Sequence, residues 1–397
     1  MTLPTPHSLP APEAMAAQAG TPEAVAQPRS HPPSHPPSQR PAGSGADPDH
    51  DQAACRALMR GGSKTFFAAS LLLPARVRAP ASALYAFCRL ADDAIDQGGD
   101  SALAMHGLRQ RLDAIYAGRP QPIDADRALA GVVHRHGLPR ALLDALLDGF
   151  LWDTEGHRYD SLEDLHAYGA RVAGTVGAMM AMVMGVRDAA ALARACELGV
   201  AMQLTNIARD VGEDARNGRC YLPRQWLREA GLDPDRWLAA PAFNPALASV
   251  IQRLLVEADR LYRRAEHGVA ALPRDCRPAI QAARLAYAEI GRELERHGVD
   301  SLQHRAVVAL PRKLALIARA SAAAWVSPAR GPAPEAPLPA IADLVDAAST
   351  AWARNPAPVG PRAQATLAQP TTRSVGERIT WVIELFERQA EQQRALR

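Results

Sequence analysis

The chain has 397 residues, of which 48% are hydrophobic and 22% charged, and its formal net charge is +3. Its 45 basic and 42 acidic side chains give no strong overall field, which argues against a protein dedicated to binding nucleic acid. The five cysteines include no C-x-x-C pair, which excludes a cysteine-cluster zinc site and favours a reducing, cytoplasmic setting.

Proline divides the chain into regions. Of the 33 prolines, 12 lie in residues 1–50, nine in residues 328–370 and 12 in the 277 residues between residues 50 and 328. Residues 1–50 have too little apolar surface to offset the entropy of ordering, so we predict a disordered N-terminal tail. Residues 51–327 are rich in Ala, Leu and Arg and nearly free of helix breakers, which predicts one all-α domain.

The helical period begins near residue 51, and no segment alternates with period two for long enough to predict a strand. Turn residues mark several boundaries, since Pro80 is expected to open a helix and Gly118-Arg119-Pro120 to close one. The predicted helices are 52–59, 80–98, 101–117, 125–136, 139–151, 161–185, 188–216, 245–271, 275–297 and 302–325.

A second Pro/Ala-rich linker is predicted at residues 328–372, with a weak helical patch near 338–353. Residues 373–397 then place apolar side chains at helical spacing between Glu and Arg, which predicts an amphipathic helix. This helix has two alternatives, docking on the main domain or contact with a membrane or partner. The charge-free apolar stretch from Val172 to Val186 is shorter than the roughly 20 residues of a spanning helix, so at most peripheral contact with the inner membrane is expected.

The helix expected from Pro80 carries two aspartates one turn apart. A rotation of about 100° per residue puts its apolar residues on one narrow stripe, formed by Leu84, Phe87, Cys88, Ala91 and Ile95. Beside this core stripe lies a polar stripe of Tyr85, Arg89, Asp92 and Asp96, whereas Asp93 points to the far face. Like charges at i, i+4 repel, so a positive group is expected between the two carboxylates.

The segment from Gln203 to Asp214 repeats this design. Its core stripe consists of Val200, Leu204, Ile207 and Val211, and the adjoining polar arc of Gln203, Asn206, Asp210 and Asp214. Oxygen ligands without His or Cys suit Mg²⁺ or Mn²⁺. Each aspartate pair taken alone is better explained as a solvated acidic face, but two pairs that both adjoin an apolar stripe favour a site that clamps a diphosphate between metal ions.

With these motifs the chain resembles the phytoene/squalene synthase family of head-to-head prenyl synthases. Residues 172–186 are most similar to bacterial phytoene synthases. The chain departs from the family pattern at Gly62, where relatives often have a side chain, and at Ala170-Arg171, where many have tyrosines. The matching stretches are Gly62-Ser63-Lys64-Thr65-Phe66, Tyr85 to Asp96, Val172 to Gly177, Gln203 to Asp214, Gly218 to Pro223 and Ala283 to Tyr287.

The resemblance implies an isoprenoid-synthase-type helical bundle around a central cavity. It also implies a prenyltransferase of carotenoid biosynthesis, which joins two geranylgeranyl diphosphates through a cyclopropyl diphosphate to give phytoene. By the same resemblance, Mg²⁺ or Mn²⁺ is expected at Asp92, Asp96, Asn206, Asp210 and Asp214. Those four aspartates and Arg89 are the expected catalytic residues, and the expected substrate contacts are Ser63, Lys64, Thr65, Phe66, Tyr85, Gln203, Arg209 and Tyr287.

Two alternatives stay open. One is a squalene or dehydrosqualene synthase acting on farnesyl diphosphate; reductive squalene formation needs a nicotinamide donor, and no Gly-x-Gly-x-x-Gly turn is present, so NADPH is not expected. The other is a non-catalytic scaffold of the same fold, which would be expected to lack one acidic pair. The expected partners are two prenyl diphosphates and no nucleic acid; contacts with a membrane and with the desaturase that acts next are further expectations.

Overall fold

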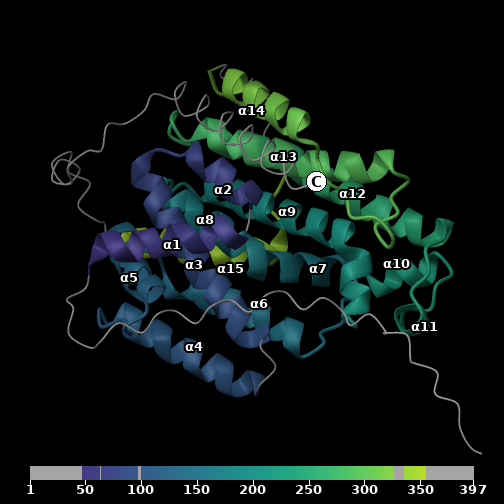
Figure 1. Ribbon diagram of the computed structural model, residues 1–397, viewed down its shortest axis with the longest axis horizontal. Helices are drawn as coiled ribbons and strands as arrows, with labels where there is room; N and C mark the ends of the chain where they lie inside the picture. The colour runs from purple at the N-terminus through teal and green to yellow at the C-terminus, as the bar shows by residue number, and fades with distance from the viewer. Residues whose placement is uncertain (1–46, 63, 97–99, 326–334, 355–397) are drawn as a thin grey trace, which may run out of the picture. The chain divides into compact units, whose positions relative to one another are not determined.

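The computed structural model describes residues 47–62, 64–96, 100–325 and 335–354, in which every regular element is helical (Figure 1), as the all-α prediction requires. Ser63 and the predicted helix 373–397 lie outside the described residues. The helices are α1 Pro48–Gly62, α2 Lys64–Leu71, α3 Ala75–Asp96, α4 Ser101–Tyr116, α5 Asp124–His136, α6 Arg140–Thr154, α7 Leu162–Gly169, the π-helix η1 Ala170–Gly174, α8 Thr175–Val183, α9 Ala189–Arg216, α10 Arg224–Glu229, α11 Pro234–Ala239, α12 Pro245–Val269, α13 Arg277–Arg296, α14 Leu310–Trp325, the 3₁₀ turn η2 Pro339–Ile341 and α15 Ala342–Arg354.

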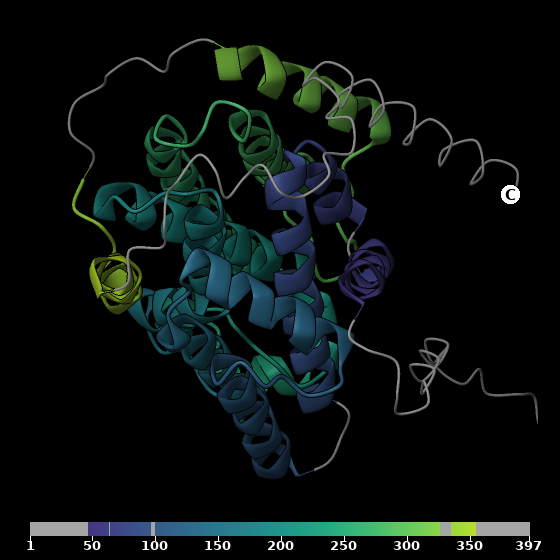
Figure 2. The same ribbon diagram turned by 90° about the vertical axis from the view of Figure 1, so that its left-hand side faces the viewer.

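Helix α9 is the central element. Its 28 residues pack against α8, α12, α13 and α15 (Figure 1), while α14 lies at the edge of the bundle on α13 (Figure 2). The Asp188 side chain caps its first turn by accepting the Ala191 amide at 2.9 Å, as an N-cap aspartate does. The predicted core stripe from Val200 to Val211 is at most 4% exposed, which confirms the orientation expected for this helix.

Helix α3 begins at Ala75 rather than at Pro80, so the predicted start was wrong. The Pro74 carbonyl accepts the Val77 and Arg78 amides at 2.9 and 3.0 Å, and the helix starts five residues earlier than predicted. A proline inside a helix removes one hydrogen bond, yet Pro80 is buried and the helix continues through it. The core stripe is confirmed for Leu84, Phe87, Ala91 and Ile95, which are at most 6% exposed, whereas Cys88 is half-buried.

Other boundaries also differ from the prediction. The expected helix 161–185 is interrupted by η1, and the expected helix 302–325 begins at Leu310. The first residues of the expected helix instead form a turn, in which the Asp300 carboxylate accepts the Leu302 and Gln303 amides at 3.1 and 3.0 Å. Helices α2, α10 and α11 were not predicted, because six to eight residues are too short to show a helical period.

Glycine allows α9 to approach η1 and α8 at backbone distance. A Cβ atom on Gly199 would lie 2.2 Å from the Ala173 carbonyl oxygen, and one on Gly177 would lie 2.2 Å from the Ala195 carbonyl oxygen. Because both neighbours are backbone atoms, they cannot move aside as a flexible side chain can. These two glycines fix the separation of two of the helices that form the site.

We therefore expect Gly199→Ala to lower the free energy of unfolding by about 1–3 kcal/mol, the usual cost of overpacking. The matched control is Gly131→Ala in α5, where no atom lies within 4 Å of the added Cβ. That exposed substitution should stabilise the protein by about 0.5–1 kcal/mol, because alanine favours a helix over glycine. Urea unfolding of both variants checks this, and equal effects would contradict it.

Candidate active site

A cavity of about 270 Å³ lies among α8, α9, α12 and α13. Its polar end is formed by Gln203 and Asn206 of α9 and Tyr287 of α13. The α9 positions that line it run from Ala191 to Asn206, which corresponds to roughly 22 Å at 1.5 Å per residue. Most of the remaining wall is apolar, so the cavity suits a long apolar chain with a polar end.

Asp210 and Asp214 lie on α9, one and two turns beyond this polar end. The Arg209 guanidinium binds Asp210, with Nε donating to Oδ1 at 2.8 Å, and Arg305 Nε lies 3.0 Å from the same oxygen. Asn206 Nδ2 lies 3.5 Å from Gln203 Oε1. The predicted arc is therefore present, with two arginines providing the positive charge next to it.

The Asp214 carboxyl lies where negative charge gathers. Burial, followed by the nearby charges of Asp210 and Glu213, raises its pKa to about 7, although Arg219 acts in the opposite direction. A bound cation would relieve this repulsion. The second acidic face thus has the electrostatic character of a cation site.

On α3 the polar stripe is less regular than predicted. Arg89 Nη2 lies 2.6 Å from Asp93 Oδ1, and Arg89 Nη1 lies 3.9 Å from Asp92 Oδ2. Asp93 was expected to point to the far face, but the long arginine side chain reaches it because residues four apart are neighbours on a helix. The Asp96 side chain and those of Lys64, Thr65 and Phe66 lie outside the described residues, so their predicted roles stay predictions.

Two tyrosines are near the charged groups of these faces. Burial raises the pKa of Tyr85. Arg89 lowers this pKa and Tyr287 raises it. Burial also raises the pKa of Tyr287, which Arg209 lowers and Asp210 raises. Tyr287 of α13 is therefore near Tyr85 on α3 and near Arg209 and Asp210 on α9.

A metal ion fits this set of donors. In the part of the chain that the structure describes, no three His, Cys, Asp or Glu side chains are grouped closely enough to hold a metal unaided. Mg²⁺, however, normally completes its shell with water and substrate phosphate oxygens. Carboxylate and amide oxygens are the donors that such an ion prefers, and a bound cation would favour the ionised form of Asp214.

Sequence reasoning missed a second polar group beside Asp214. Tyr168 Oη donates to Asp153 Oδ2 at 2.9 Å, and Tyr221 Oη donates to Asp153 Oδ1 at 2.7 Å. Burial raises the pKa of both tyrosines, so their hydroxyls stay neutral donors, and the Asp153 charge contributes to the raised pKa of Asp214. Tyr221 stands in the Gly218 to Pro223 motif, the one signal that could have indicated this group.

The comparisons agree with this geometry. A family model described as squalene/phytoene synthase matches residues 59–312. The phytoene synthase of Rhodobacter capsulatus is 52% identical over 305 residues, which cover 75% of this chain and 90% of that protein. The phytoene synthase of Cereibacter sphaeroides is 51% identical over 315 residues, which cover 76% of this chain and 88% of that protein. A dehydrosqualene synthase structure has a TM-score of 0.64 at 30% identity, over 70% of this chain and 99% of that one. A squalene synthase structure from Alicyclobacillus acidocaldarius has a TM-score of 0.60 at 26% identity, over 63% of this chain and 95% of that one.

A helical bundle around an apolar cavity, with carboxylates and arginines at one end, has the form of an enzyme for long apolar chains with a charged head group. The chain belongs to the squalene/phytoene synthase family. Among the described residues, no helix combines the length and the apolar character that crossing a bilayer requires.

Proposed function

We propose that this chain is a prenyltransferase that joins two molecules of geranylgeranyl diphosphate head to head and converts the product into phytoene, in carotenoid biosynthesis. The observation that carries the proposal is the apolar cavity. It leads away from Gln203, Asn206 and Tyr287 towards the N-terminal end of α9. Relatives named phytoene synthase, at about half identity, favour this substrate over farnesyl diphosphate.

In the first step the C1–O bond of one substrate breaks, and both electrons leave with the diphosphate. The C2–C3 alkene of the second substrate attacks C1, and loss of a proton closes the cyclopropane ring. In the second step the remaining diphosphate leaves, the carbon skeleton rearranges and a second proton is lost. No hydride enters, so the overall reaction needs no reductant.

Chain residues contribute binding, charge and orientation. Arg89 and Arg209 supply positive charge for the diphosphates, and Gln203 and Asn206 position the head group at the cavity. Tyr287 lines the cavity, so its face is available to a developing cation, an interaction that contributes up to about 2 kcal/mol when it is desolvated; the same role is proposed for Tyr85. Asp92, Asp96, Asn206, Asp210 and Asp214 would hold Mg²⁺ or Mn²⁺, which supplies charge neutralisation to the leaving group when bound.

We expect purified protein with geranylgeranyl diphosphate and Mg²⁺ to form phytoene without NADPH, because the reaction loses protons and gains no hydride. Product analysis by chromatography and mass spectrometry checks this. A thirty-carbon product from farnesyl diphosphate at the higher kcat/KM would favour the squalene or dehydrosqualene alternative. No product from either substrate would favour a non-catalytic scaffold.

We also propose peripheral contact with a membrane, since the hydrocarbon product needs an apolar phase to enter. The amphipathic pattern of residues 373–397, with its arginines, suits anionic head groups. Deleting residues 373–397 should weaken co-sedimentation with anionic vesicles at low salt and leave single-turnover chemistry intact. Unchanged co-sedimentation would exclude this segment. Contact with the desaturase that consumes phytoene stays a prediction.

A further inference from the structure

One charged side chain lies on the wall of the cavity. Among the described residues that line it, Arg194 alone is charged, and it is only 4% exposed. It precedes Gln203 by nine residues on α9, or roughly 13 Å, and so lies towards the end opposite the polar one. Its stem crosses Gly268 of α12, where an added Cβ would lie 2.5 Å from the Arg194 Cβ.

The head group of Arg194 belongs to a buried ion network. Its Nη1 lies 2.8 Å from Glu197 Oε2, and the other Glu197 oxygen binds the Arg264 guanidinium of α12. Glu197 is 0% exposed. Arg194 Nε has no acceptor among the described residues. A buried donor without a partner lowers the free energy of unfolding, so stability alone does not explain this arginine.

Residues 335–354, which we call the strap, complete this network from outside the family-matched segment 59–312. The Leu338 amide donates to Glu197 Oε1 at 3.2 Å, and the Glu335 carbonyl accepts from Arg194 Nη2 at 3.3 Å. The Glu335 carboxylate binds Arg260 at 2.6 Å and Arg264 at 2.9 Å. The strap therefore contacts both partners that orient Arg194, and Arg194 itself.

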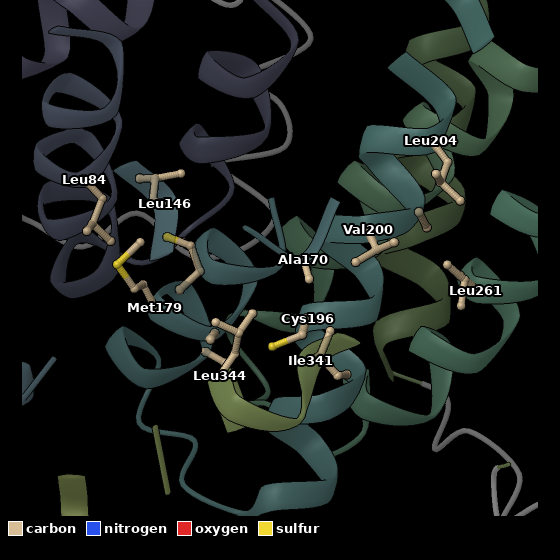
Figure 3. Close-up of a cluster of buried hydrophobic side chains, with 14 of the residues drawn as sticks. Leu84, Leu146, Ala170, Met179, Cys196, Val200, Leu204, Leu261, Ile341 and Leu344 are labelled. Atoms are coloured by element: carbon tan, nitrogen blue, oxygen red, sulfur yellow. The ribbon is translucent and has the colours of Figure 1, made fainter. Parts of the chain in front are cut away.

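The strap also supports the outer side of the cavity wall. Ile341 and Ala348 are 0% exposed and Leu344 is 7% exposed. Figure 3 shows Ile341 and Leu344 beside Cys196 of α9, and a Cβ on Gly174 would lie 3.5 Å from a Leu344 methyl group. The strap thus packs on α9 and η1, two of the elements whose other residues line the cavity.

We propose that the strap sets the length of prenyl chain that the cavity accepts. By holding the Glu197–Arg264 pair, it keeps the aliphatic stem of Arg194 across the end of the cavity opposite the polar one. An arginine suits this role because its stem is apolar towards the chain while its head group stays in a polar network. Arg194 is then a specificity-determining residue and the strap a positioning element. This proposal rests on the function proposed above and specifies its substrate length.

The test measures kcat/KM for geranylfarnesyl diphosphate, one isoprene unit longer, relative to geranylgeranyl diphosphate. Arg194→Ala should raise this ratio at least about tenfold, because discrimination by an apolar pocket lies in this range per added group. Glu335→Ala should raise it less, since the backbone contacts of the strap remain. The Glu335 side chain is 65% exposed, so this variant should fold even if Arg194→Ala does not.

Arg312→Ala is the matched control. It too removes one arginine from a fully buried carboxylate, Glu289 of α13, which does not line the cavity. It should lower the melting temperature and leave the ratio unchanged, whereas a merely structural role of the Arg194 network would leave the ratio unchanged in every variant.

An unchanged ratio in folded Arg194→Ala would overturn the role of Arg194. A changed ratio in Arg194→Ala with none in Glu335→Ala would overturn the role of the strap. Failure of the wild-type protein to form a forty-carbon hydrocarbon from geranylgeranyl diphosphate would instead refute the proposed function. The two failures are therefore distinguishable.

Discussion

Asp210→Asn should lower kcat at least about a hundredfold, the range seen when a charge that acts on the transition state is lost. Asp210 lies next to the polar end of the cavity and is held by Arg209 and Arg305, so its carboxylate is fixed in place before substrate binds. Asparagine keeps the size of the side chain but removes the charge. Without that charge, a divalent cation and its diphosphate are held less tightly as the C1–O bond breaks.

Steady-state kinetics at several Mg²⁺ concentrations check this expectation. The control is Glu213→Gln, which removes one negative charge from the same helix at an exposed position 3.4 Å from Arg305. It should change kcat by no more than about threefold. Excess EDTA should stop product formation by the unmodified protein. Near-normal kcat in Asp210→Asn would mean that the second acidic face is only surface.

The periodic part of the molecule could be predicted from the sequence. The core stripes of α3 and α9 are buried as expected, because burial of one helix face leaves a strong period in the residue pattern. That pattern also placed Gln203 and Asn206 on the face that lines the cavity. Local helix geometry was sufficient for these residues.

Features built from distant segments could not be predicted in this way. The group of Tyr168, Asp153 and Tyr221 joins α7, α6 and the turn before α10, and no single helix shows a pattern for it. The strap is similar, since Leu338 meets Glu197 across 141 positions of sequence. Its weak helical patch near 338–353 indicated η2 and α15 but not the helices that they contact.

Replacement of Asp214 by asparagine should change stability and activity in opposite directions. Burial and neighbouring carboxylates raise the folded-state pKa of Asp214 to about 7, above its ordinary 3.8. The folded protein therefore binds this proton more tightly than the unfolded chain, and stability from this group falls as the pH rises from about 4 through 7. Above pH 7 the full penalty is present. Asparagine carries no charge, so metal-free Asp214→Asn should melt a few degrees higher than the unmodified protein at pH 8.

The advantage in melting temperature should shrink as the pH is lowered towards 4, while kcat at pH 8 with Mg²⁺ should fall at least about a hundredfold. Calorimetry between pH 5 and 8 and the product assay measure the two effects. Asp259→Asn is the control, because this half-exposed carboxylate of α12 is paired with Arg263 and lies outside the cavity lining. It should leave both the pH trend and kcat unchanged.

A cation site predicts a carboxylate that lowers the stability of the empty protein and yet is required for turnover, because the repulsion is relieved when the ion binds. A lower melting temperature for Asp214→Asn at pH 8, or full activity, would contradict that account.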